Sequence, residues 1–171
     1  TAISMNQITV TLPDGSHRQV EAGTPVSAIA TGISPRLADA ALAAWVGDRM
    51  VDLNYPLNAD ATVRIVTSKS PEALELYRHS TAHLLAAAVT ALFPKTQCGI
   101  GPPIDEGFFY DFVVERPFVP EDLAAIEAKM RELASADYKF ERQMWPRQEA
   151  IDFFQQRGEP LKVQLIEEKT A

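Results

Sequence analysis

The sequence predicts an α+β fold built as two units that meet near residue 70. Short segments in which apolar and polar residues alternate, separated by turn signals, fill the first part of the chain. A polar joint follows at residues 67–71, and the second part opens with a long segment of helical periodicity. We therefore expect one domain over residues 1–69 and a second over residues 70–171.

The elements of the first part follow one another in the order β-β-α-β-β. Pro13-Asp14-Gly15-Ser16 joins the first two strands as a hairpin turn. Thr24-Pro25 should start a short helix that Gly32 ends, and Ser34-Pro35 should open another helical turn. A small sheet over one helix in this order is typical of a ubiquitin-like β-grasp domain. The strands are expected at residues 8–12, 17–20, 42–46, 50–53 and 62–66.

A long helix should open the second part. Ser70 suits its N-cap and Pro71 its first position, and Pro94 marks the stop after Phe93. Its apolar residues recur at helical spacing, so we expect them to face a core. These residues are Leu74, Tyr77, Leu84, Leu85, Val89 and Leu92.

Two of the three histidines, His79 and His83, lie four residues apart in this helix. That spacing puts both imidazoles on one helical face, with Cβ atoms roughly 6 Å apart, where they can reach one metal ion, water or substrate group. The small residues Ala86, Ala87 and Thr90 leave room beside them. The spacing alone also fits two structural histidines. A metalloprotease motif is excluded because Ser80, not Glu, follows the first histidine.

The remainder of the second part predicts alternating strands and helices. A Gly-rich and Pro-rich loop at residues 99–103 should precede an aromatic strand, and Gly158 should close the second of two later helices. Aromatic and basic residues interleave between Tyr138 and Arg147, a pattern that fits either a nucleic-acid contact or an amphipathic strand. The strands are expected at residues 107–115, 138–144 and 161–166, and the helices at residues 120–136 and 146–157.

Composition limits the class of protein. A hydrophobic fraction of 46% with 23% charged residues is typical of a globular chain. The apolar runs fall far short of the ~20 residues that a bilayer requires, no secretory signal opens the chain, and one cysteine, Cys98, excludes an internal disulfide framework. We therefore expect a cytoplasmic protein with no membrane contact. The net charge of −7 makes any RNA contact a local one.

Four segments in order resemble the N-terminal part of bacterial threonyl-tRNA synthetases. Residues 7–67 are similar to the TGS module of that family, and residues 72–166 to the first part of its editing domain. The matching segments are Arg78-His79-Ser80-Thr81-Ala82-His83-Leu84-Leu85, Gly99-Ile100-Gly101-Pro102, Gly107-Phe108-Phe109-Tyr110-Asp111 and Arg157-Gly158-Glu159-Pro160-Leu161-Lys162-Val163.

The resemblance implies a function and a site. In the family, the full-length enzyme charges tRNA(Thr) with threonine at the expense of ATP, and its editing domain hydrolyses mischarged Ser-tRNA(Thr). His79, His83, Tyr110 and Lys162 correspond to editing-site residues of the family. ATP, magnesium and zinc are implied as cofactors of the full-length enzyme, which is expected to be a homodimer.

The sequence departs from the family pattern at its end. A downstream Cys-x-x-x-His motif completes the family site, and Cys98 does not replace it because it lies in the loop before Ile100. His79 and His83 offer at most two metal ligands, so we expect an incomplete editing site, no tightly bound metal or other cofactor, and a monomeric, inactive fragment. The alternative is a non-catalytic TGS module that binds RNA or protein and carries structural histidines.

Overall fold

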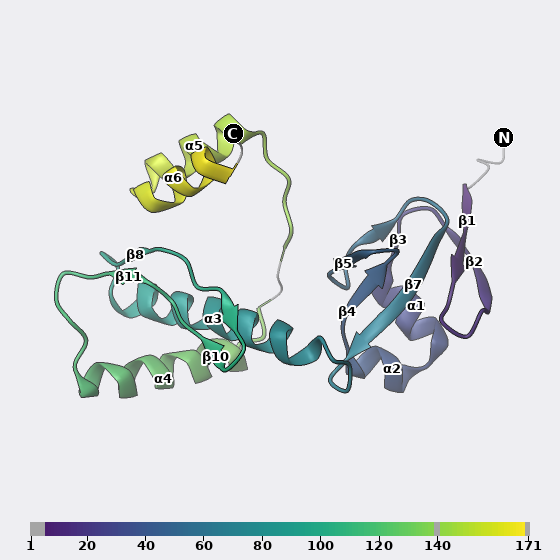
Figure 1. Cartoon of the computed structure of the whole chain (residues 1–171), viewed down its shortest axis with the longest axis horizontal. Coiled ribbons are helices and arrows are strands. Elements are labelled where there is room, and N and C mark those ends of the chain that lie inside the picture. Colours follow the sequence, from purple (N-terminus) through teal and green to yellow (C-terminus); the bar gives the residue numbers. More distant parts are fainter. Residues whose placement is uncertain (1–5, 139–140, 170–171) are drawn as a thin grey trace. The chain divides into compact units, whose positions relative to one another are not determined.

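The computed structural model describes residues 6–138 and 141–169 of the chain. The chain divides into two compact units, of which the first ends at Leu74 and the second begins at Glu75 (Figure 1). The division falls slightly after the expected boundary at residue 70, because Glu72 is tied to the first unit. Its carboxylate accepts a hydrogen bond from Trp45 Nε1 at 2.9 Å and forms an ion pair with Arg64.

A five-stranded sheet in the order β2-β1-β7-β4-β5 forms the first unit. β1 pairs with β2 as an antiparallel hairpin and with β7 in parallel, while β4 pairs antiparallel with both β5 and β7. A separate two-residue pair, β3 with β6, closes the unit. The strands are β1 (Gln7–Thr11), β2 (His17–Glu21), β3 (Thr24–Pro25), β4 (Ala41–Val46), β5 (Arg49–Val51), β6 (Pro56–Leu57) and β7 (Ala61–Thr67).

Two short helices, α1 (Val26–Ile33) and α2 (Pro35–Ala40), accompany this sheet. Ser34 caps α2 as expected, since its hydroxyl accepts a hydrogen bond from the Leu37 amide at 3.1 Å. α1 begins one residue after the Thr24-Pro25 pair, which forms β3, and continues past Gly32. The predicted α+β class is confirmed, with a β-grasp unit first.

The core of the first unit lies between the sheet and α1. Alternate residues of β1 point into it, as the sequence pattern predicted, and Val26 and Ile29 of α1 cover them. Every one of these side chains is less than 9% exposed. The core residues are Ile8, Val10, Leu12, Val26, Ile29, Ala44, Val51, Leu57 and Val63.

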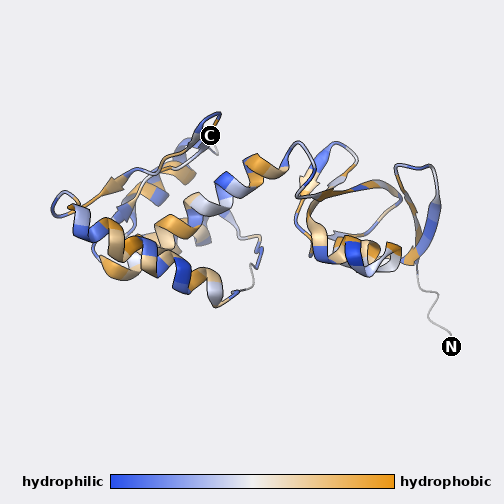
Figure 2. Ribbon diagram, turned by 90° about the horizontal axis from the view of Figure 1, so that it is seen from below, coloured by the Kyte–Doolittle hydropathy of each residue, from blue (hydrophilic) through white to orange (hydrophobic). Residues whose placement is uncertain are grey.

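The second unit is mainly helical. β8 pairs with β11 and β9 with β10, each antiparallel, and in Figure 2 the helices of this unit alternate between hydrophobic and hydrophilic colours. A small core joins Ala88 and Val89 of α3 to Ile126 of α4. The elements are α3 (Ala73–Leu92), β8 (Gln97–Cys98), β9 (Pro103–Ile104), β10 (Gly107–Phe108), β11 (Phe112–Val113), α4 (Pro120–Ser135), α5 (Arg147–Gln156) and α6 (Pro160–Lys169).

The structure changes two expectations about α3. The helix begins at Ala73, because the Ser70 hydroxyl accepts a hydrogen bond from the Thr67 amide and belongs to the preceding turn. Leu74, Tyr77 and Leu92 are exposed rather than buried, with 56%, 73% and 38% of their surface accessible. The core of the unit touches a narrower stripe of the helix than the apolar pattern indicated.

No helix among the described residues is long and apolar enough to cross a membrane.

The structure departs from the three strands predicted for the second part. Residues 161–166 lie in α6, where Pro160 takes the first helical position and the Glu159 carbonyl accepts from the Lys162 and Val163 amides. The aromatic strand is broken into β10 and β11 by residues 109–111. The predicted strand at 138–144 has no strand in its described residues, and residues 139–140 lie outside them.

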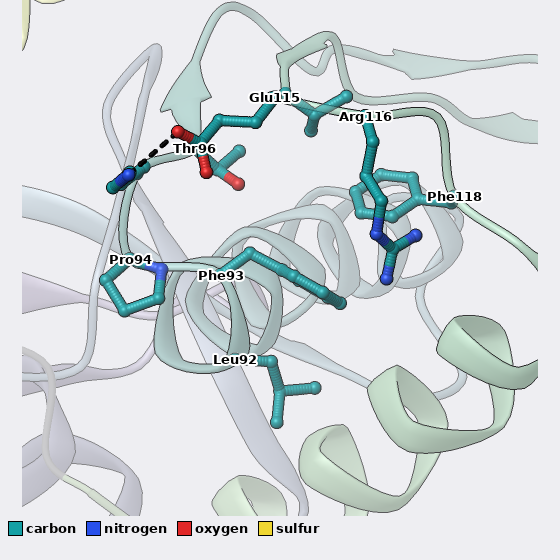
Figure 3. A pocket seen from close by; sticks show the side chains of 9 residues that line it. Leu92, Phe93, Pro94, Thr96, Glu115, Arg116 and Phe118 are labelled. Atoms are coloured by element: carbon teal, nitrogen blue, oxygen red, sulfur yellow. Dashed lines mark hydrogen bonds and ion pairs between the residues drawn. The ribbon is translucent and has the colours of Figure 1, made fainter.

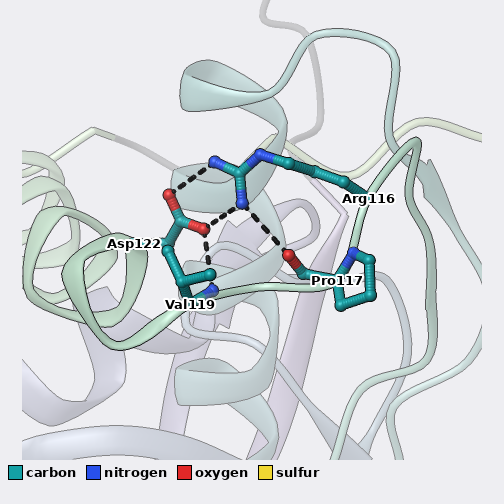
Figure 4. Close-up of polar contacts among 4 residues, drawn as sticks. All are labelled: Arg116, Pro117, Val119 and Asp122. Atoms are coloured by element: carbon teal, nitrogen blue, oxygen red, sulfur yellow. Dashed lines mark hydrogen bonds and ion pairs between the residues drawn. The ribbon is translucent and has the colours of Figure 1, made fainter.

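An ion-pair cluster fixes the start of α4 (Figure 4). Arg116 donates to both carboxylate oxygens of Asp122, at 2.6 and 2.9 Å, and Asp122 also accepts from the Val119 amide at 2.9 Å. The Arg116 guanidinium and then the Val119 amide lower the pKa of Asp122 from 3.8 to about 2. Asp122 is therefore ionised at neutral pH, where its charge also favours the helix N-terminus.

Candidate functional site

The two histidines of α3 stack on each other. Their ring centroids lie 4.8 Å apart at an interplanar angle of 26°, as the four-residue spacing predicts. Burial lowers the pKa of His83, and the positive charges of His79 and Lys162 lower it further. His83 is nevertheless exposed to solvent, and its lowered pKa favours the neutral imidazole, the form that can accept a proton.

Lys162 connects α6 to the loop after β8. Its ammonium donates to the Gly99 carbonyl at 3.2 Å and to the Tyr110 hydroxyl at 3.5 Å. Lys162 lies in the first turn of α6, where the sequence predicted a strand. The helical conformation of this segment therefore directs the lysine toward Tyr110. The positive charge of Lys162 also contributes to the lowered pKa of His83, after burial and the charge of His79.

Tyr110 occupies a fixed place between β10 and β11. Its ring stacks on Phe112, with centroids 4.9 Å apart. The Tyr110 ring also lies against Gly101, where an added Cβ would lie 2.2 Å from Tyr110 Cδ2. Backbone hydrogen bonds from Gly99 to Asp111 at 2.8 Å and from Asp111 to Ile100 at 2.9 Å join the two segments. The glycine thus allows the tyrosine to lie against the loop that also binds Lys162.

The four predicted site residues form two contacting pairs in the second unit, His79 with His83 and Lys162 with Tyr110. His79 stacks on His83, Lys162 acts electrostatically on His83, and Lys162 contacts Tyr110. Cys98 also lies near Lys162, but burial raises the pKa of its thiol, so the thiol stays protonated at neutral pH. The sequence identified these four residues by motif. It placed Gly99 in a matching segment but gave no role to its carbonyl, which accepts a hydrogen bond from the lysine.

The donor set of this region does not match a closed metal site. His79 and His83 contribute two ring nitrogens, whereas structural zinc takes four ligands. Within residues 6–138 and 141–169, no three His, Cys, Asp or Glu side chains are grouped so that they could hold a metal ion.

A hollow of about 470 Å³ lies beside His83, between α3 and the end of α4. Ala87 lines it, in agreement with the room that small residues were expected to leave. The sequence did not predict the contribution of α4, because the packing of α3 on α4 is a tertiary feature. The other lining residues are Tyr77, Ser80, Thr81, Leu84, Leu133, Ala134, Asp137 and Tyr138.

A second groove, of about 570 Å³, lies at the C-terminal end of α3 and away from the histidines (Figure 3). Leu92, Phe93 and Phe118 supply its apolar wall, and the Lys95–Glu115 ion pair at 2.9 Å crosses its rim. None of the four predicted site residues, His79, His83, Tyr110 and Lys162, lines this groove. The groove is therefore not a candidate for the chemistry of the histidine region.

Comparison with known proteins assigns the first unit. A family model described as the TGS domain matches residues 8–67. Residues 8–67 are a TGS domain. This TGS domain comprises β1 to β7 with α1 and α2, so the β-grasp topology and the family match describe the same stretch of chain.

Comparison with whole proteins extends beyond the TGS domain. The chain is 55% identical over 164 residues to the threonine–tRNA ligase of Geobacter sp. (strain M21), an alignment covering 96% of this chain and 26% of the relative. It is 53% identical over 158 residues to that of Methylococcus capsulatus and 54% over 159 residues to that of Granulibacter bethesdensis. The chain is thus a homologue of the N-terminal region of threonine–tRNA ligases and spans about a quarter of their length.

The homology covers both the TGS domain and the region that carries the candidate site. His79, His83, Tyr110 and Lys162 all lie C-terminal to the TGS domain, which ends at residue 67. A TGS module without further function would leave the shared identity of the second unit unexplained. The homology therefore favours the ligase interpretation over the alternative of a separate binding module.

Proposed function

We propose that the whole protein carrying this chain is a threonine–tRNA ligase, which charges tRNA(Thr) with threonine at the expense of ATP. The supporting observation is the 55% identity that covers 96% of the chain. As the family resemblance implies, we expect the whole enzyme to use ATP with magnesium, to hold zinc outside this region and to form a homodimer. The TGS domain and the second unit would then serve the tRNA substrate.

We further propose that the second unit contributes to hydrolysis of mischarged Ser-tRNA(Thr). Serine lacks one methyl group of threonine, and a methyl-sized difference gives a single pocket only ~10 to 200-fold discrimination. A second, hydrolytic site corrects the remaining errors. The arrangement that supports this role is a neutral imidazole, His83, within electrostatic reach of an ammonium, Lys162, that is itself held by Tyr110.

Each group would have a distinct task in ester hydrolysis. His83, with its lowered pKa, accepts a proton from the attacking water, and His79 stacks on it and holds its ring orientation. The Lys162 ammonium stabilises the negative charge that develops on the ester carbonyl oxygen. Tyr110 fixes the position of Lys162 through its hydroxyl. Water attack then releases serine and leaves the tRNA hydroxyl free.

The test is a deacylation assay with the whole enzyme and Ser-tRNA(Thr). His83→Ala and Lys162→Ala should each slow hydrolysis by a factor of at least about 100, the usual contribution of a positioned general base or oxyanion donor. Matched controls remove a histidine and a lysine elsewhere, as His17→Ala in β2 and Lys95→Ala after α3. Threonylation should stay close to wild type in all four variants.

Two results would contradict the proposal in different ways. Unchanged hydrolysis in both site variants would refute the site assignment and favour structural histidines. A whole enzyme that fails to attach threonine to tRNA(Thr) would refute the ligase function itself.

A further inference from the structure

Arg78 directly precedes His79 on α3, and it is bound to the polypeptide segment that carries Tyr110. Its Nη1 atom donates to the Ile104 carbonyl at 3.1 Å and to the Asp105 carbonyl at 2.6 Å. Both acceptors are backbone atoms of the β9–β10 hairpin. One guanidinium therefore ties the histidine helix to this hairpin.

The hairpin is coupled to Tyr110 from both of its ends. Phe108, which pairs with Pro103, lies two residues before Tyr110. Gly101, two residues before Pro103, lies directly against the Tyr110 ring, as the 2.2 Å separation of an added Cβ from Cδ2 shows. A displacement of the hairpin would therefore move the tyrosine and the glycine behind it together.

The far side of the same segment is held by Lys162 of α6, through the Gly99 carbonyl and the Tyr110 hydroxyl. The segment from Gly99 to Asp111 is thus anchored to α3 by Arg78 and to α6 by Lys162. Since the histidines are on α3, the Arg78 anchor sets their separation from the tyrosine and the lysine.

We infer that Arg78 is a positioning residue for the proposed hydrolytic site: it holds the Gly99–Asp111 segment at its distance from His79 and His83. The inference rests on the proposed function. The side chains of Arg78 and His79 leave α3 in different directions, because successive residues are about 100° apart around an α-helix. Arg78 therefore acts on the site through the segment that it binds, while the histidines face the substrate.

The size of the effect follows from the geometry of catalysis. A misplacement of about 1 Å at a reacting group can cost about 100-fold in rate. Arg78→Met removes both hydrogen bonds but keeps an unbranched apolar stem, and the freed carbonyls lie at an exposed position where water can bind them. Arg78→Lys keeps the charge and one donor group of similar reach, so it should recover most of the loss.

The first experiment uses the 171-residue chain and measures amide chemical shifts by NMR. Arg78→Met should shift the amides of Gly101 and Tyr110, which are remote from Arg78 in sequence, and Arg78→Lys should shift them less. The matched control is Arg131→Met on α4, which removes an arginine paired with an exposed Glu127 and should leave both amides unmoved. Unmoved Gly101 and Tyr110 amides in folded Arg78→Met would overturn the inference.

The second experiment uses the whole enzyme and separates kcat from KM for hydrolysis of Ser-tRNA(Thr). Arg78→Met should lower kcat about 10 to 100-fold with KM changed little, because tRNA binding uses a much larger surface. Arg78→Lys should restore most of kcat, and Arg131→Met should match wild type. An unchanged kcat in Arg78→Met would overturn the inference, as would a loss confined to KM.

The two experiments distinguish this inference from the proposed function. A wild-type enzyme that does not hydrolyse Ser-tRNA(Thr) refutes the function, and the amide shifts still decide whether Arg78 positions the segment. If Arg78→Met does not fold, Arg78→Gln replaces it, because its uncharged side chain is shorter than that of arginine and loses the hydrogen bonds of the guanidinium to the Ile104 and Asp105 carbonyls. A lowered kcat in the folded Arg78→Gln enzyme supports positioning, and a wild-type kcat overturns it.

Discussion

Replacement of Gly101 by alanine tests how closely Tyr110 is packed. The added Cβ would lie 2.2 Å from Tyr110 Cδ2, 2.7 Å from Cγ and 2.8 Å from the Phe109 carbonyl oxygen. Carbon atoms in contact prefer at least about 3.5 Å, so the ring must move by roughly 3.5 − 2.2, or about 1.3 Å. The carbonyl is backbone and cannot rotate away. Overpacking of this kind costs about 1 to 3 kcal/mol.

Gly107→Ala is the matched control. Gly107 lies in the β9–β10 hairpin that follows Gly101, and a Cβ added there meets no atom within 4 Å. Neither glycine has the positive φ that would itself penalise alanine. Where the backbone is compatible, Gly→Ala stabilises by about 0.4 to 1 kcal/mol through the unfolded chain. We therefore expect the two variants to differ in unfolding free energy by roughly 1 to 4 kcal/mol.

Urea unfolding of the second unit measures this difference. Trp145 in that unit supplies the fluorescence signal, and a Trp45→Phe background shared by all variants removes the signal of the first unit. The Tyr110 ring resonances should also shift in Gly101→Ala and stay in place in Gly107→Ala. Stabilities equal within about 0.5 kcal/mol, with unshifted Tyr110 resonances, would refute the close packing.

Three further predictions concern the same unit. Asp122 has a pKa of about 2 in the folded state, below its ordinary 3.8, so its stabilising effect is present above about pH 4 and is lost as pH falls toward 2. In urea unfolding, Asp122→Asn should therefore lose less unfolding free energy over that pH range than wild type does. Equal losses of unfolding free energy in the two proteins would contradict this. Val89→Ala should cost about 1.5 to 3 kcal/mol because Val89 is fully buried, whereas Leu92→Ala, at a 38% exposed position, should cost less; equal urea midpoints would be inconsistent with the core described. The 171-residue chain should hydrolyse Ser-tRNA(Thr) far more slowly than the whole enzyme, because His79 and His83 are exposed to water that screens the reacting charges. Comparable rates of the two proteins in a deacylation assay would contradict this prediction.

Local sequence signals predicted the TGS domain well. Alternation marked β1, and Ser34-Pro35 marked the start of α2, because each signal acts on residues close in the chain. The second unit was harder to predict. Leu161 to Ile166 alternates like a strand, yet Pro160 starts a helix there, and the alternation within six residues could not decide between the two.

The candidate site shows the same limit. The spacing of His79 and His83 predicted their stacking, since both lie on one helix. The contacts of Lys162 with Gly99 and Tyr110 depend on how α6 packs, which no local pattern records. Motif resemblance supplied Tyr110 and Lys162 as site residues. Arg78, Gly99 and Gly101 also lie in the matching segments, but only the tertiary structure shows what they contact.

The anchoring of Gly99 by Lys162 has a consequence for the order of folding. This contact spans 63 residues of chain, whereas the β1–β2 hairpin pairs Thr11 with His17 across a short turn. Closing a long loop costs more entropy and takes longer than closing a short one. During synthesis, Lys162 leaves the ribosome well after the histidine helix and the tyrosine segment. The region around His83 therefore assembles late, when α6 arrives, and the chain can complete its TGS domain before that.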